Sequence, residues 1–158
     1  MKHHRYRYRP YQPGDLEALN LLEDEREVIE ANREFFEAQA NKDKSRKTCI
    51  TAIYKGKILF LVGYYETEPG VAQVFVIPDK SIFEHPTAFV RAVIKWRRWL
   101  EKCPWCHRIQ TVSLAIEAMD IWMRKIGFAC EAKLVGYTEA GDYNLWSRNR
   151  LNGVWGRL

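Results

Sequence analysis

The chain has 158 residues, 47% hydrophobic and 28% charged, which is enough to bury a core within one domain. No apolar run approaches the roughly 18–20 residues of a membrane span, and no apolar stretch follows the basic start, so we expect neither a membrane span nor a secretory signal. The net charge of +5 is modest and favours a solvated basic surface over a dedicated nucleic-acid-binding protein.

The first third of the chain is typical of one strand followed by two helices. Arginine and tyrosine alternate in RYRYR, which predicts a strand. Asp15 is placed to cap a helix that begins at Leu16. Apolar residues at helical spacing predict a second helix from about Asp24 to Ala40.

Period-two patterns then predict three strands in sequence. TCITAIY and ILFLVGYYE form a hairpin around Lys55 and Gly56, and VAQVFVI is the third strand. Farther along, Pro86 suits the first turn of a helix that runs to about Lys102, and Gly127 ends a short helix that contains IWMRKI. RIQTVSL, CEAKLVGYT and YNLWSRN are the remaining strands.

The resulting order, β-α-α-β-β-β-α-β-α-β-β, predicts an α/β (α+β) fold. We expect a mixed, largely antiparallel sheet with helices on both faces, because a strand–helix–strand unit stands at the centre of the order. The predicted domain covers residues 1–149, and residues 150–158 form a C-terminal tail.

The order of elements and two local motifs resemble the GNAT family of N-acetyltransferases. YRYRPYQPGDLEAL is similar to the family's first strand and the turn into its first helix, and IWMRKIGF is similar to its Y-x-K-x-G-F helix end. The resemblance covers nearly the whole chain. It implies a GNAT-like fold and, if the protein is active, transfer of an acetyl group from acetyl-CoA.

A narrower resemblance is to small proteins of short-tailed bacteriophages, a family that includes an internal virion protein. The residues that carry it are His85-Pro86, Phe89, Arg91, Trp122 and Gly127-Phe128. This resemblance implies a role in virion assembly, with phage structural or assembly proteins as partners. It also implies a location in the host cytoplasm and the virion.

The segment that would hold acetyl-CoA in the GNAT family lacks its glycines here. In the family, backbone N–H groups after the fourth strand bind the diphosphate, and glycine lets the backbone approach closely. The matching segment is PDKSIFEHP, in which Phe83 crowds a phosphate while Asp79 and Glu84 repel it. Lys80 and Ser81 still favour an anion, so we predict a weakened site.

Two further features of the family are missing from the IWMRKI helix. Met123 stands where a tyrosine normally assists the leaving thiolate, and methionine has no proton to give. Ile116 stands where an asparagine is common. We therefore expect no catalytic residues and no cofactor. If the protein is active, acetyl-CoA is the cofactor and Glu66 or Glu68 is the candidate base.

A GNAT-like sheet splays between its fourth and fifth strands, and we expect Phe83 and Met123 to fill this cleft. If the cleft stays open for a ligand, its candidate lining is Val74, Val76, Lys80, Ser81, Ser113 and Met123.

Cys103, Cys106 and His107 form a C-x-x-C-H motif between a helix and a strand. Covalent haem would need export and an enclosing helical shell, neither of which is indicated. Structural zinc needs four ligands, and Cys130 completes the set only if the fold brings it near. A redox dithiol normally opens a helix, whereas this pair closes one. We interpret the motif as a connector with incidental cysteines, with zinc as the weaker alternative.

Two surface features bear on partners. The helix from Pro86 carries the basic residues Arg91, Lys95, Arg98 and Lys102 on one face. Such a stripe can follow phosphates, but a solvated helix face is the more ordinary interpretation. In the tail, Trp155 and Leu158 either fold back onto the domain or anchor a protein partner.

Three functional hypotheses follow. The first is a catalytically degenerate GNAT-fold phage protein that acts in virion assembly through protein contacts. The second is an acetyl-CoA-dependent N-acetyltransferase with an atypical cofactor loop. The third is a nucleic-acid-binding module that uses the basic helix and the chain ends.

Overall fold

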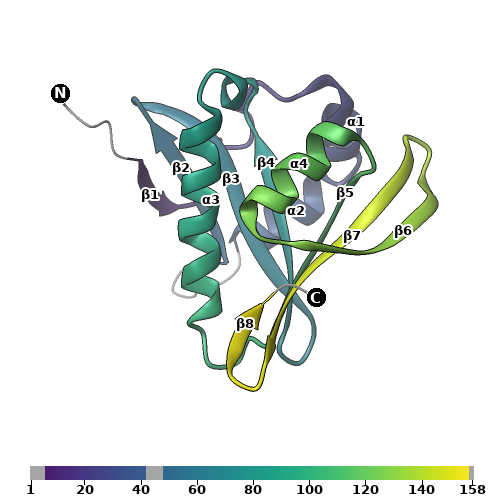
Figure 1. Cartoon of the computed structure of the whole chain (residues 1–158). Helices are drawn as coiled ribbons and strands as arrows, with labels where there is room; N and C mark the ends of the chain where they lie inside the picture. The colour runs from purple at the N-terminus through teal and green to yellow at the C-terminus, as the bar shows by residue number, and fades with distance from the viewer. Residues whose placement is uncertain (1–5, 42–47, 157–158) are drawn as a thin grey trace. The chain divides into compact units, whose positions relative to one another are not determined.

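The computed structural model describes residues 6–41 and 48–156 of the chain. Its strands form an eight-stranded, mostly antiparallel sheet in the order β1-β2-β3-β4-β5-β7-β6, with β8 paired to β7 (Figure 1). The elements are β1 (Arg7–Pro10), α1 (Glu23–Ala31), α2 (Arg33–Asn41), β2 (Cys49–Tyr54), β3 (Lys57–Glu68), β4 (Val71–Pro78), the 3₁₀ turn η2 (Lys80–Phe83), α3 (Pro86–Glu101), β5 (Arg108–Leu114), α4 (Glu117–Ile126), β6 (Ala129–Thr138), β7 (Gly141–Leu151) and β8 (Val154–Gly156). The mixed sheet and the order of its elements confirm the predicted fold class.

The chain divides into two compact units. Unit 1 comprises residues 1–65 and 75–92, and unit 2 comprises residues 66–74 and 93–158. Strands β3 and β4 and helix α3 contribute residues to both. No helix of the described ranges is long and apolar enough to cross a membrane.

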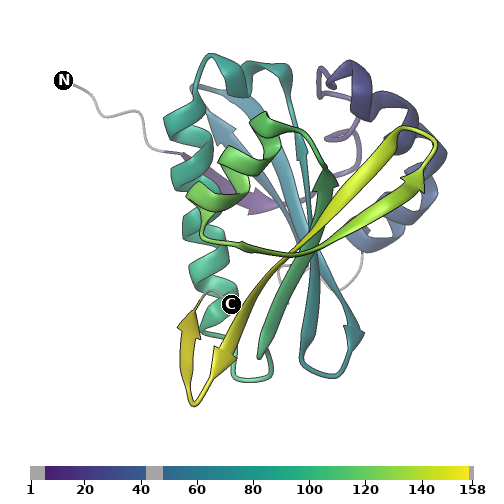
Figure 2. The ribbon, with the colours of Figure 1, turned by 45° about the vertical axis from the view of Figure 1, so that its right-hand side comes forward.

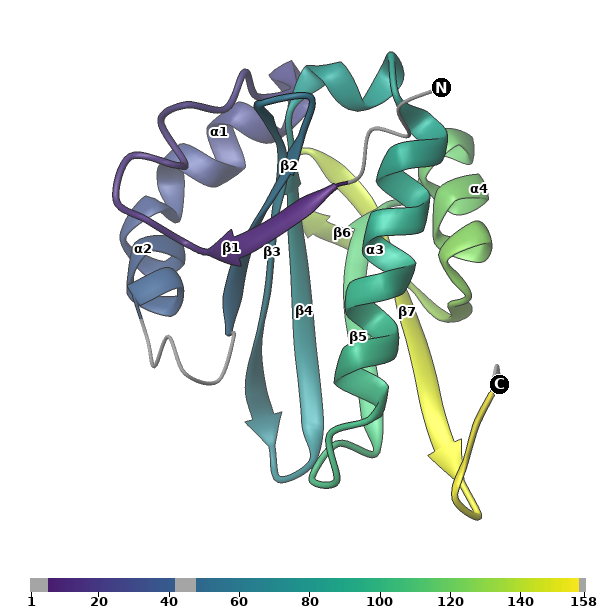
Figure 3. The ribbon, with the colours of Figure 1, turned by 90° about the vertical axis from the view of Figure 1, so that its left-hand side faces the viewer.

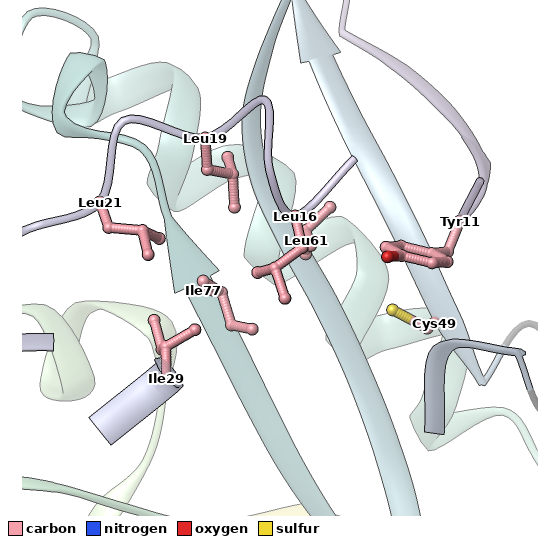
Figure 4. Packing of buried hydrophobic residues seen from close by; sticks show 8 residues of the cluster. All are labelled: Tyr11, Leu16, Leu19, Leu21, Ile29, Cys49, Leu61 and Ile77. Carbon is pink, nitrogen blue, oxygen red and sulfur yellow. The ribbon is translucent and has the colours of Figure 1, made fainter. Parts of the chain in front are cut away.

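In unit 1, helices α1 and α2 cover one face of the strands, and the first turns of α3 lie on the other face (Figure 3). Side chains alternate along β3 accordingly. The ring of Phe60 packs edge-on against Phe89 of α3, with centroids 5.2 Å apart. Leu61 instead belongs to the buried cluster shown in Figure 4. The members of this cluster are Tyr11, Leu16, Leu19, Leu21, Ile29, Cys49, Leu61 and Ile77.

The predicted helix at Leu16 is wrong, because residues 13–19 form consecutive turns and the first helix begins at Glu23. Asp15 does not cap a helix. Its carboxylate accepts two hydrogen bonds from the Arg9 guanidinium at 2.7 Å each and one from the Thr51 hydroxyl at 2.6 Å. The carboxylate is therefore used to join β1 to β2 rather than to start a helix.

The helix predicted over 24–40 is two helices, which is why the order of elements still contains two. α1 ends at Ala31 and α2 begins at Arg33. Asn32 lies between them with φ −115° and ψ 17°, and its side-chain amide donates to the carbonyl of Val28 at 2.8 Å. Asparagine competes well for such local backbone bonds, which accounts for the break.

In unit 2, β4 runs parallel to β5 where residues 71–73 face residues 108–110. β7 is antiparallel to both β5 and β6, and β8 turns back along β7 (Figure 2). Trp146 of β7 is fully buried, and its Nε1–H donates to the hydroxyl of Ser113 on β5 at 2.9 Å. Period-two patterning predicted β4, β5, β6 and β7 but not β8, which lies in the predicted tail. The Trp146–Ser113 hydrogen bond joins β7 to β5.

A buried ionic cluster ties α3 to β7 within unit 2. Glu101 receives a hydrogen bond from Arg148 and lies 3.6 Å from Nε of Arg97. The side chains of all three residues are no more than 14% exposed. Arg97 also donates to the carbonyl of Ile126 at 2.9 Å, and Arg148 donates to that of Gly127 at 3.1 Å. The cluster therefore also holds the end of α4.

Candidate functional site

The segment that follows β4 is the one that the sequence resemblance aligns with the GNAT cofactor loop. Most of its backbone N–H groups have acceptors within unit 1. The N–H of Asp79 donates to Leu59 O at 3.0 Å, and the N–H of Lys80 donates to Asn20 O at 2.9 Å. The bonds within the segment run from Ile82 N to Asp79 O at 3.0 Å, from Glu84 N to Ser81 O at 3.0 Å, and from His85 N to Ser81 O and Ile82 O at 3.2 and 3.1 Å. The bonds within the segment stabilise η2, and the bond from Lys80 attaches the segment to Asn20.

Asp79 supplies an anion to the same segment. Its Oδ1 accepts from the N–H of Ser81 at 2.8 Å, and its Oδ2 accepts from the N–H of Asn20 at 2.7 Å. Burial acts to raise the pKa of Asp79, but these hydrogen bonds outweigh burial and hold the pKa below its ordinary value. The charged Asp79 carboxylate therefore accepts hydrogen bonds from two backbone N–H groups, and such groups bind phosphate in other proteins.

Phe83 is 62% exposed at the end of η2, so its ring is not packed in an interior. The expectation that Phe83 fills a cleft is therefore wrong. Phe83 follows the buried Ile82 in a tight 3₁₀ turn, which directs neighbouring side chains to different sides.

In unit 2, the two residues that the sequence resemblance aligns with polar positions of the GNAT family are Met123 of α4 and Ile116 just before it. Met123 is 8% exposed, and Ile116 forms the N-cap of the helix without a side-chain cap hydrogen bond. The helix ends at Gly127, whose φ of +99° suits glycine. A Cβ at Gly127 would also collide with the Arg97 guanidinium, so the glycine of the G-F motif has a packing reason here.

The six residues predicted to line a cleft are divided between the units. Val74, Ser113 and Met123 belong to unit 2, whereas Val76, Lys80 and Ser81 belong to unit 1. Ser113 is buried and accepts the Trp146 hydrogen bond, so its hydroxyl already has a structural role. The cleft as a whole stays a prediction.

The two candidate bases lie on the hairpin between β3 and β4. Both Glu66 and Glu68 are exposed, and Oε1 of Glu66 accepts from the N–H of Gly70 at 3.3 Å. Their catalytic role stays a prediction.

The cysteine motif lies in the connector between α3 and β5. Cys106 is buried, and its thiol donates to the carbonyl of Arg108 at 3.5 Å, while burial raises the pKa of the Cys106 thiol to about 11. Cys130 is exposed on β6, where its thiol donates to Ala132 O at 3.8 Å. Within the described residues, no group of three or more His, Cys, Asp or Glu side chains is arranged to hold a metal.

The residues of the basic stripe on α3 are each exposed, as the helical spacing predicted; they are Arg91, Lys95, Arg98 and Lys102.

The tail folds back as a hairpin over residues 150–156. β7 continues to Leu151, beyond the predicted domain end at 149, and β8 pairs with it. The Trp155 Nε1–H donates to the carbonyl of Glu101 at 2.9 Å. Leu151 and Val154 face each other across the turn and are 64% and 69% exposed. The predicted anchor Leu158 lies outside the described residues.

Solved structures of acetyltransferases share this fold. A ribosomal-protein-S5-alanine acetyltransferase from Vibrio fischeri is 16% identical with a TM-score of 0.68, and the match covers 98% of each chain. A GNAT-family acetyltransferase from Bacillus anthracis is 15% identical with a TM-score of 0.68, covering 90% of this chain and 93% of that one. A ribosomal alpha-N-protein acetyltransferase in complex with coenzyme A is 12% identical with a TM-score of 0.68, covering 95% and 96%.

No protein-family model and no curated protein matches the chain. The resemblance to bacteriophage proteins therefore rests on the sequence motifs alone, with no support from these comparisons. Likeness at such low identity to solved structures is a statement about architecture. The chain has the GNAT acetyltransferase fold.

Proposed function

We propose that this chain uses the GNAT fold to contact other proteins and does not transfer acetyl groups. The observation that carries the proposal is the closed segment after β4, where Asp79 and backbone carbonyls already accept the amide hydrogens. A diphosphate would have to displace a charged, hydrogen-bonded carboxylate and break the bonds that form η2. Met123 on α4 offers no proton for a leaving thiolate.

The motif resemblance to phage proteins supports one biological setting for this proposal. In that setting the protein acts during virion assembly, its partners are phage structural or assembly proteins, and it is found in the host cytoplasm and the virion. The observation that favours a protein partner is the exposed apolar pair Leu151 and Val154 at the β7–β8 turn. Trp155 holds this turn in place by its bond to Glu101.

A second candidate function is acetyl-CoA-dependent N-acetyl transfer, and the comparisons favour it. The solved structures described above are acetyltransferases, and one of them contains coenzyme A. In that case the chain would bind acetyl-CoA through an altered loop, with Glu66 or Glu68 as candidate base.

Titration calorimetry with acetyl-CoA separates the two candidates. We expect no saturable heat up to about 1 mM, because the amides after β4 already have acceptors. A dissociation constant above about 1 mM corresponds to binding weaker than about −4 kcal/mol. Asp79→Ala is titrated beside the unaltered protein, because it removes the carboxylate that accepts from the backbone amides of Asn20 and Ser81. Micromolar binding by the unaltered protein would support the acetyltransferase instead.

The double variant Leu151→Ser/Val154→Ser tests the protein contact. We expect the amount of partner recovered from a lysate of phage-infected cells to fall at least tenfold, since buried apolar anchors carry most binding energy at interfaces. Ile121→Ser, which alters an exposed apolar residue of α4, is the control and should recover as much partner as the parent. Equal recovery by the double variant and the control would contradict a contact through this turn.

A further inference from the structure

Three aromatic rings follow one another on the surface of unit 1. The rings of Tyr6 and Tyr54 have centroids 6.0 Å apart, and the rings of Tyr54 and His85 have centroids 5.0 Å apart. Tyr6 immediately precedes β1, Tyr54 ends β2, and His85 immediately precedes α3. All three residues are half-buried, so each ring keeps part of its surface in contact with solvent.

Two cations flank these rings. Nζ of Lys55 lies 5.4 Å from the centroid of Tyr54. Arg91 precedes Ala92 of α3, whose carbonyl accepts a hydrogen bond from the hydroxyl of Tyr8 on β1. Burial raises the pKa of the Tyr6 hydroxyl, and the Arg91 charge acts against that rise. Both Lys55 and Arg91 are exposed, and neither takes part in an ion pair with another described residue.

Lys55 occupies the turn of the β2–β3 hairpin, so the backbone of that turn fixes the position of its Cα. Lys55 has φ +51° and Gly56 has φ +80°, which is the geometry of a tight two-residue hairpin turn. The turn joins β2 to β3, so the lysine stands on a rigid edge rather than on a long loop. Glu84, the neighbour of His85 in the chain, is exposed and carries one negative charge against the two positive charges of Lys55 and Arg91.

We propose that the Tyr54 surface, defined as Tyr6, Tyr54, Lys55, His85 and Arg91, binds single-stranded nucleic acid. Every base has a face that stacks on an aromatic ring, and every nucleotide adds one phosphate for a cation. An acidic peptide would use the two cations but would gain little from the rings. The proposal goes beyond the proposed function and uses neither the amides of residues 79–84 nor the β7–β8 turn.

Fluorescence anisotropy with a labelled single-stranded 20-mer tests the proposal. The double variant Lys55→Glu/Arg91→Glu should bind at least tenfold more weakly. Its plot of log affinity against log salt should be shallower by about 1.4, since each lost phosphate contact contributes about 0.7. The control Lys125→Glu/Lys133→Glu carries the same change in charge on exposed residues of unit 2 outside the basic stripe of α3, and should bind within about twofold of the parent.

Two substitutions of Tyr54 separate stacking from charge. Tyr54→Leu should weaken binding about tenfold, because a stacked base is worth about 1–3 kcal/mol. Tyr54→Phe keeps the ring and should bind like the parent. Equal losses in the two double variants would overturn the proposal, as would the absence of binding at low salt. Equal binding of poly-glutamate or anionic vesicles would also overturn it. None of these results bears on acetyl-CoA binding, so the two proposals fail independently.

Discussion

Replacing Glu101 with alanine is expected to lower the free energy of unfolding by about 3–5 kcal/mol. Glu101 lies at the end of α3, 11% exposed, between the guanidinium groups of Arg97 and Arg148. Removing its carboxylate leaves two positive charges in a confined space, and Arg148 also loses a hydrogen-bond acceptor. A buried charge without its counter-charge costs far more than the pair contributes when intact.

Chemical unfolding followed by tryptophan fluorescence measures this loss. Glu101→Gln should cost less than alanine, because the amide oxygen still accepts a hydrogen bond although the charge is gone. Glu139→Ala, in the exposed turn between β6 and β7, is the control and should change stability by no more than about 0.5 kcal/mol. If Glu101→Ala matched this control, the cluster would have no role in holding α3, α4 and β7 together.

Trp146→Ala should cost a similar amount, about 3–5 kcal/mol. The indole is fully buried, bonds to the hydroxyl of Ser113 and has the Arg124 guanidinium 5.7 Å from its ring. Alanine would leave a cavity in unit 2, and the surrounding strands would relax only partly around it. The hydroxyl of Ser113 would also lose its indole donor.

Two companion variants divide this effect into packing and hydrogen bonding. Trp146→Phe retains most of the apolar volume and should cost about 1–2 kcal/mol, with the lost bond to Ser113 as one part. Ser113→Ala removes the acceptor and should cost about 1 kcal/mol. Denaturant unfolding gives all three values, and a loss below about 1 kcal/mol for Trp146→Ala would contradict the packing described for unit 2.

Local patterns predicted the strands well, because a strand beside a core must alternate its side chains. The hairpin at Lys55 and Gly56 is an example, since two adjacent positive φ angles follow directly from the turn type. Asp15 shows where the same reasoning fails. Its residue type suits a helix N-cap, but Arg9 and the distant Thr51 compete for the carboxylate and prevail.

The candidate loop was predicted only in part. The missing glycines and the charge of Asp79 are visible in the sequence, and both weaken a diphosphate site. The partner of Asp79 is not visible, because Asn20 is far away in the chain and bonds through its backbone, which any residue type would supply. The ion pair of Arg97 with Glu101 has helical i,i+4 spacing, whereas Arg148 joins them only through the fold.

The central claim is that the amides of the segment after β4 are already hydrogen-bonded and do not bind the cofactor. Its most direct test is an NMR titration of the ¹⁵N-labelled protein with coenzyme A, observed at the backbone amides of Lys80, Ser81 and Ile82. We expect these three signals to stay in place up to about 1 mM coenzyme A, because their hydrogens are already bonded to Asn20, to the Asp79 carboxylate and to the Asp79 carbonyl. Saturable shifts of these amides at micromolar coenzyme A would contradict this claim and would make the chain a candidate cofactor-binding acetyltransferase.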